Sequence, residues 1–315
     1  MTLAAGARRG LDDFEHLSLG KRVRLRNLFG GSSFAVVLDY ARPIETGPRA
    51  FDGEAQSDPD VVLDSALKGA VSATALNVGV ALRYWKRYAG KLSLILKLNG
   101  RADLAGEGGF AACHASVEDA VRLGADAAGY VLSLGSPAQE HDFVQFSEVR
   151  EEAERYGLPL IVWAAVSPAA VAQRGGPRSP FAVEYAARVA QELGADVVVL
   201  ETPSAPAAGS PPPYDALEFD EQESLTRAVA AAGETLVWFS PPAEASEDAL
   251  EKGAALAYRV GAAGYLLDRA LWGKSDLASR LRPKRGEDGK PTEPPVSDGE
   301  QEAPEKEPEP APQES

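Results

Sequence analysis

Three charged residues stand near the ends of short apolar segments. Asp39 closes the run 34–40, Lys97 lies in the second half of 92–99, and Glu201 closes GADVVVLE at 194–201. An amine and two carboxylates are the groups that enzymes use for attack on carbonyls and for proton transfer. Together with His114 the two carboxylates could also hold Mg²⁺, but their spacing does not demand it. We therefore predict neither a metal nor a cofactor.

Each of these residues also has a structural interpretation, and the sequence leaves both open. Glu201 could form an ion pair with Arg269 or Lys97, or it could act as a general base or metal ligand. Lys97 could balance the charge of Asp39 or Glu201, or it could be a nucleophilic amine at an unusual strand. Asp39 could simply balance Lys97, or it could move protons or bind a hydroxyl group.

The elements that must position these residues alternate between apolar segments and helical patterns. The apolar segments are 34–40, 71–78, 92–99, 128–134, 159–166, 196–201, 235–240 and 264–268. Short apolar strands separated by helices predict a parallel sheet buried on both faces, and eight strands are the number that closes a (β/α)₈ TIM barrel. A doubly wound open sheet is the alternative. A basic, amphipathic helix at 18–30 precedes the first strand and could plug the bottom of the barrel.

In such a barrel, function is found at the carboxyl-terminal ends of the strands. This rule selects Asp39, Lys97 and Glu201 as candidate catalytic residues. It also selects four candidate substrate-binding residues, namely Asn99, Trp163, Ser240 and Arg269.

Composition limits the class of protein. The net charge is −15, and the segment 286–315 carries ten acidic residues and two lysines. We expect a flexible N-terminus at 1–17, a barrel at 18–282 and a disordered, acidic, Pro/Glu-rich tail at 283–315. An acidic body argues against nucleic acid as a partner. No apolar run approaches the length of a membrane span, and the single cysteine fits a reducing cytoplasm.

Several segments carry a family likeness. LILKLNGRADL, AARVAQELGADVV and the block between them resemble the archaeal-type class I fructose-bisphosphate aldolases, relatives of deoxyribose-phosphate aldolase. The resemblance implies a (β/α)₈ barrel, a homo-oligomer and a sugar-phosphate substrate. It also implies a lysine that forms a Schiff base with the substrate carbonyl, which provides an electron sink when the carbon–carbon bond breaks.

The family pattern is kept in the first half of the barrel. Asp39 matches the acidic residue of the first strand, although Tyr40 replaces the histidine that follows it in the family. The KLNG segment that begins at Lys97 is intact, and Trp163 matches the tryptophan of the fifth strand. Ala165 stands where the family has an acid–base tyrosine.

The pattern is changed in the second half. By resemblance, Glu201 occupies the position of the Schiff-base lysine. The phosphate-binding Ser-Gly-Gly of the seventh strand is replaced by Ser240 and two prolines, which have no N–H to donate. Arg269 is kept at the eighth strand, but Asp268 adds a negative charge beside it.

We therefore expect an aldolase homologue that binds a small carbonyl compound, a sugar-phosphate-like compound or a partner, without classical fructose-bisphosphate cleavage. The alternative is an active lyase that uses Lys97 or an acid–base pair of Asp39 and Glu201. The Pro-rich segment 202–220 is long for a strand–helix connection. We expect it to rise over the barrel mouth as a lid, a cap or an interface.

Overall fold

Eight parallel strands close into a barrel in the order β1 to β8, and β1 pairs with β8. The computed structural model describes residues 16–51, 53–105, 110–207, 209–242, 244–268, 272, 275–283 and 294. The strands are β1 Ala35–Asp39, β2 Ala73–Asn77, β3 Ser93–Lys97, β4 Ala127–Leu134, β5 Leu160–Val166, β6 Val197–Glu201, β7 Leu236–Ser240 and β8 Gly264–Leu267. The predicted TIM barrel is confirmed, and the open-sheet alternative is wrong.

The alternation of side chains along each strand separates two hydrophobic clusters. One cluster fills the inside of the barrel, and on β6 it contains Val197 and Val199. The other lies between the strands and the helices, and it contains Val198 and Leu200. Because successive side chains point to opposite faces, Glu201 shares the inner face of β6. The same rule places Asp39 and Lys97 on the inner faces of β1 and β3.

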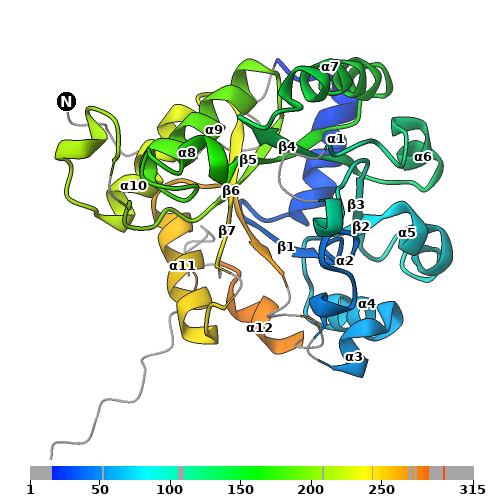
Figure 1. Cartoon of the computed structure of the whole chain (residues 1–315). Helices are drawn as coiled ribbons and strands as arrows, with labels where there is room; N and C mark the ends of the chain where they lie inside the picture. The colour runs from blue at the N-terminus through cyan, green and yellow to red at the C-terminus, as the bar shows by residue number, and fades with distance from the viewer. Residues whose placement is uncertain are drawn as a thin grey trace, which may run out of the picture.

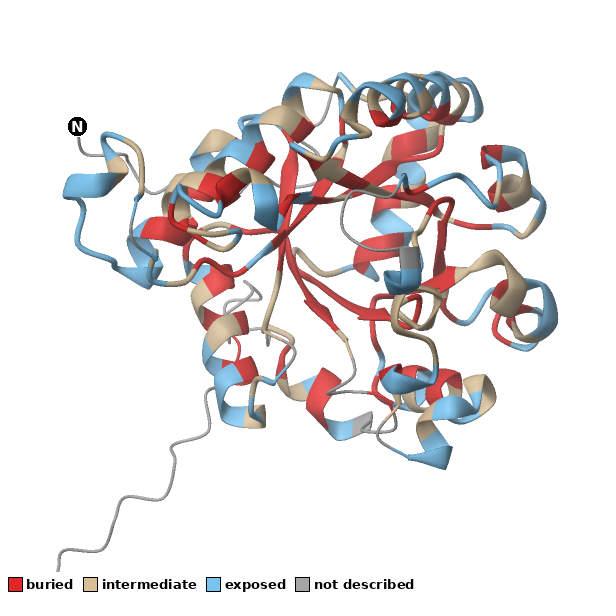
Figure 2. Ribbon diagram, viewed as in Figure 1, coloured by how far each residue is buried: buried red, intermediate tan, exposed pale blue. Residues whose placement is uncertain are grey.

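Helices ring the barrel (Figure 1). The longer ones are α4 Pro59–Lys68, α5 Val78–Tyr84, α6 Val117–Arg122, α7 Gln139–Tyr156, α9 Pro180–Glu192, α10 Glu221–Ala231, α11 Glu247–Arg259 and α12 Ser275–Arg280. Several of them begin after a capping serine whose side chain accepts a hydrogen bond from the first turn, such as Ser116 for α6 and Ser246 for α11. The strands at the centre are buried, whereas the outer helix faces are exposed (Figure 2).

Helix α1 (Leu19–Phe29) closes the bottom of the barrel, as the sequence predicts. Leu25, Leu28 and Phe29 join the cluster inside the barrel. The ammonium group of Lys21 lies 2.9 Å from Asp196, just before β6, and 2.7 Å from Glu154 on α7. The side chains of Lys21 and Asp196 are both only 5% exposed. A buried ion pair therefore anchors this helix to the barrel.

The connections carry structure that the sequence analysis did not predict. After β1 the chain forms two short helices, α2 Pro43–Thr46 and α3 Glu54–Ser57, with a 3₁₀ turn between them. A further short helix, α8 Pro168–Val171, follows β5. Of the predicted end segments, 1–15 and all of 284–315 except Pro294 lie outside the described residues.

Candidate functional site

Lys97 lies at the carboxyl-terminal end of β3, inside the barrel mouth. Its ammonium nitrogen is 3.0 Å from Oδ2 of Asp39, and the two side chains are 6% and 8% exposed. The second carboxylate oxygen of Asp39 accepts a hydrogen bond from the Ala41 amide at 2.9 Å. Of the two charge partners that the sequence allows for Lys97, the structure therefore selects Asp39 and not Glu201.

An indole ring covers the other side of the amine. The nitrogen of Lys97 lies 4.1 Å from the centre of the Trp163 ring, which is a cation–π contact. Gly129 on β4 makes room for this arrangement. A Cβ atom at position 129 would lie 3.0 Å from the Trp163 ring and 3.1 Å from Cγ of Lys97. The absence of a side chain at Gly129 thus allows the lysine stem and the ring to approach each other.

Gly129→Ala should therefore destabilise the protein by about 1–3 kcal/mol, since a rigid ring and a buried stem must both shift. Urea unfolding followed by far-UV circular dichroism measures the change. Gly79→Ala on α5 is the matched control, because its Cβ would have only Arg83 near it, at 3.6 Å. A Gly129→Ala protein as stable as the control would show that the packing around Lys97 is loose.

Two polar residues near Lys97 were missed by the sequence analysis. Asn77 at the end of β2 is paired in register with Lys97. Its Nδ2 donates to the Ala41 carbonyl at 2.7 Å, but its buried Oδ1 has no hydrogen-bond partner among the residues that the structure describes. Burial raises the pKa of the Glu45 carboxyl on α2, Lys97 opposes the shift and Asp39 adds to it. Asn77 could have been found by the strand-end rule, whereas Glu45 lies on a helix that the sequence did not predict.

An ion pair and a hydrogen bond join the residues after β8 to the end of β1 and to the connection that follows it. Asp268 forms an ion pair of 2.6 Å with Arg42, in the connection that follows β1. Trp272 donates a hydrogen bond of 3.0 Å from its indole nitrogen to the carbonyl of Asp39. Its ring packs edge-on against Tyr40 with the centres 4.7 Å apart. These contacts hold the backbone of Asp39 in place.

The opposite side of the mouth is more open. The Glu201 side chain is 56% exposed, and Nε of Arg178 lies 4.0 Å from it. Of the two ion-pair partners that the sequence allows for Glu201, Lys97 instead lies beside Asp39, and Arg269 lies outside the described residues. Ala165 on β5 is also exposed. No contact joins Asp39 to Glu201 in the described part of the chain.

Two of the other predicted binding residues have polar groups that already form hydrogen bonds within the protein. Both polar atoms of the Asn99 side chain form hydrogen bonds. Oδ1 accepts from the Val131 amide, and Nδ2 donates to the carbonyls of Val131 and Ala111. The carbonyl of Ser240 accepts from the amide and hydroxyl of Thr202. Arg269 lies outside the described residues. The predicted roles of these residues in binding stay predictions.

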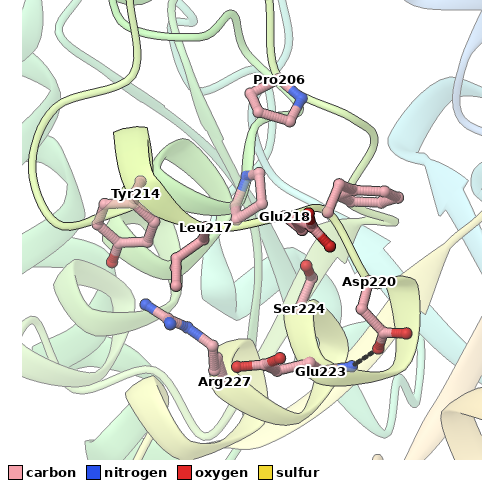
Figure 3. Close-up of a pocket in the computed structure, with 10 residues that line it drawn as sticks. Pro206, Tyr214, Leu217, Glu218, Asp220, Glu223, Ser224 and Arg227 are labelled. Atoms are coloured by element: carbon pink, nitrogen blue, oxygen red, sulfur yellow. Dashed lines mark hydrogen bonds between the residues drawn. The ribbon is translucent and has the colours of Figure 1, made fainter.

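The connection from β6 to α10 does not lie over the mouth in the part that can be followed, contrary to our expectation. In Figure 1 it projects outward beside α10. The Tyr214 ring packs edge-on against Phe181 of α9, and its hydroxyl donates to Glu184 at 2.8 Å. Arg227 of α10 donates to Glu184 at 2.9 Å and stacks over Tyr214. These contacts pull the segment against the outer helices, where it lines a narrow pocket (Figure 3).

The described part of the chain contains neither a candidate metal site nor a helix that could span a membrane. There, the His, Cys, Asp and Glu residues form no group of three that could hold a metal ion. The helices described are all too short or too polar to cross a bilayer.

Comparison with known proteins agrees with this architecture. A model of the DeoC/LacD family aldolases matches residues 44–274. The class 1 fructose-bisphosphate aldolase of Thermoproteus tenax is 30% identical over 262 residues, which span 81% of this chain and 89% of the relative. The corresponding enzyme of Halobacterium salinarum is 29% identical over 247 residues, covering 78% and 87% of the two chains.

Solved structures extend the likeness to three dimensions. A Schiff base forming fructose-1,6-bisphosphate aldolase superimposes with a TM-score of 0.68 at 28% identity, over 82% of this chain and 97% of the other. An aldolase from Slackia heliotrinireducens, at 21% identity, shows the same fold with a TM-score of 0.74, over 87% and 89%. The matched family model spans most of the barrel, including the strands that carry Lys97, Trp163 and Glu201, and the chain therefore belongs to the DeoC/LacD aldolase family.

Proposed function

We propose that the barrel mouth binds a small hydroxylated carbonyl compound and that the chain does not cleave fructose 1,6-bisphosphate through a Schiff base. The observation that carries this proposal is the position of Lys97, enclosed between Asp39 at 3.0 Å and the face of Trp163 at 4.1 Å. A carboxylate and an indole face both attract an ammonium group. An amine must lose its proton before it can attack a carbonyl, so these contacts favour binding over attack.

The residue on β6 supports the same conclusion. An archaeal fructose-1,6-bisphosphate aldolase that resembles this chain was solved with its catalytic Lys covalently bound to the carbinolamine intermediate of the substrate. By resemblance, that position is Glu201 here, on the inner face of β6 and 56% exposed. A carboxylate cannot form an imine, so the covalent route is absent at this position.

The groups around Lys97 favour a polar ligand with hydroxyl and carbonyl groups. Asn77 offers an unpartnered carbonyl oxygen, and Trp163 offers an unpartnered indole N–H. Lys97 adds a positive charge that would attract a carbonyl oxygen. In contrast, Pro241 and Pro242 offer no amide to a phosphate. We therefore infer that the phosphate contributes little to recognition.

A lyase that uses Lys97 is the second candidate, because Asp39 is placed to accept a proton from the amine. Borohydride reduction of the full chain in the presence of dihydroxyacetone phosphate, followed by mass spectrometry, separates the two functions. We expect no covalent adduct and no cleavage of fructose 1,6-bisphosphate. An adduct on Lys97 would establish the second candidate and contradict the first.

Restoring the lysine on β6 should not restore cleavage. Glu201→Lys provides an amine, but Ala165 still lacks a proton-transfer group and the two prolines still lack phosphate-binding amides. We expect its cleavage of fructose 1,6-bisphosphate to stay at background, as measured by a coupled assay for triose phosphate. Efficient cleavage by this single variant would show that the rest of the catalytic machinery is intact.

A further inference from the structure

A second polar site lies at the other end of the barrel, facing away from Lys97. A groove of about 730 Å³ runs over the amino-terminal ends of β1 to β4. Arg26, Lys91 and Arg282 line it, and among its described lining residues only Asp126 is acidic. Oδ1 of Asp126 accepts a hydrogen bond from Asn27 at 2.9 Å. An excess of positive charge in one groove stands out in a chain with a net charge of −15.

Arg282 is the group that most needs an anion. Burial lowers the pKa of its guanidinium, and among the residues that the structure describes no carboxylate acts on it as a charge partner. Its Nη2 donates to the Ser72 hydroxyl at 2.8 Å, but its buried Nε has no hydrogen-bond partner in the described part of the chain. A partly buried charge without a counter-charge carries part of the cost of desolvation, so an anion in the groove would relieve that cost.

Ser72 offers a further donor at the same place. Ser72 is only 5% exposed and lines the groove. The hydroxyl oxygen accepts from both the Val36 amide at 3.1 Å and Arg282. Because both bonds are accepted, the hydroxyl proton is left to be donated.

Three of the glycines that line the groove face open space. A Cβ at Gly31, Gly90 or Gly124 would meet no atom within 4 Å, and all three residues have a positive φ. Each of these glycines lies in a connection that leads into a strand. They leave the backbone accessible beside the cationic side chains, which suits a compact ligand.

We propose that this groove binds a small oxyanion, with a phosphate or carboxylate group held by Arg282 and Ser72 and attracted by Lys91. The planar fork of an arginine matches the geometry of such groups. The anion could be a free metabolite or a carboxylate of the acidic segment that follows Pro283 in the chain. Both sources share the same chemistry, and the experiment below separates them.

The test is calorimetric titration of the full chain with inorganic phosphate. We expect saturable binding that is about tenfold or more weaker in Arg282→Gln, since a charge-assisted hydrogen bond is lost. Arg83→Gln on α5 is the control, because its exposed side chain lies away from the groove.

A second variant keeps the test decisive if Arg282→Gln does not fold. Lys91 is exposed, and Lys91→Gln should weaken binding about two- to fivefold. If phosphate binds only after the ten acidic residues of 286–315 are changed to amides, the occupant is the chain's own acidic segment. Phosphate binding to neither protein, or binding that is insensitive to Arg282 and Lys91, would overturn the proposal.

Discussion

Replacing Lys97 with methionine should lower the free energy of unfolding by about 3–5 kcal/mol, because Asp39 would be left buried without a counter-charge. The Asp39 side chain is 8% exposed, and its remaining hydrogen bond comes from one backbone amide. The indole face of Trp163 would also lose its cation. Urea unfolding at neutral pH measures the difference.

A double variant separates the charge effect from the packing effect. Lys97→Met combined with Asp39→Asn removes both charges, and most of the lost stability should return. Lys86→Met is the matched control, because Lys86 is an exposed lysine on the outside of the barrel. If the single variant were as stable as this control, Asp39 and Lys97 would not form the buried pair on which the site depends.

The second large effect is expected at the bottom of the barrel. Lys21→Met removes the cation between Asp196 and Glu154, and it should also cost about 3–5 kcal/mol at neutral pH. Glu154 is 59% exposed and can turn to water, but Asp196 is 5% exposed and cannot. Lys68→Met on the outer face of α4 is the control.

The cost of Lys21→Met should depend on pH. Burial raises the pKa of the Asp196 carboxyl, and in the native protein Lys21 opposes that shift. Without Lys21 the shift is larger, so the folded variant takes up a proton at a pH where the unfolded chain has none bound. Its stability therefore falls as the pH rises from the unfolded to the folded pKa. We expect the difference in free energy of unfolding between Lys21→Met and the native protein to narrow toward pH 4. A difference that is independent of pH would contradict this assignment.

The rule that function lies at the carboxyl-terminal ends of barrel strands was sufficient to select much of the barrel mouth. It selected Asp39, Lys97 and Glu201, and the alternation of side chains along each strand explains why all three share an inner face. The same rule would have found Asn77, which ends β2 in the same way. Capping serines and a glycine that follows a helix mark several of the observed helix boundaries, at Ser116, Ser246 and Gly157.

The sequence could not predict which residues contact one another around the site, because those contacts depend on connections whose course is set by packing. Glu45 and Arg42 come close to the site only through α2, a helix of four residues in a segment without a periodic pattern. The amide of Asn99 joins β4 to the segment before α6, a contact that depends on the course of that segment. The segment 202–220 was expected over the mouth, but contacts with Glu184 and Arg227 hold Tyr214 against the outer helices.

Direct titration of the full chain with dihydroxyacetone and with dihydroxyacetone phosphate tests the proposed site most directly. We predict saturable binding of both compounds with affinities within about threefold of each other, because the prolines after β7 offer the phosphate no amide. Lys97→Met should weaken both about tenfold or more, while Lys86→Met should change neither. Binding that is indifferent to Lys97, or a covalent adduct at this residue after borohydride reduction, would contradict a mouth that holds its ligand by the charge of an intact ammonium group.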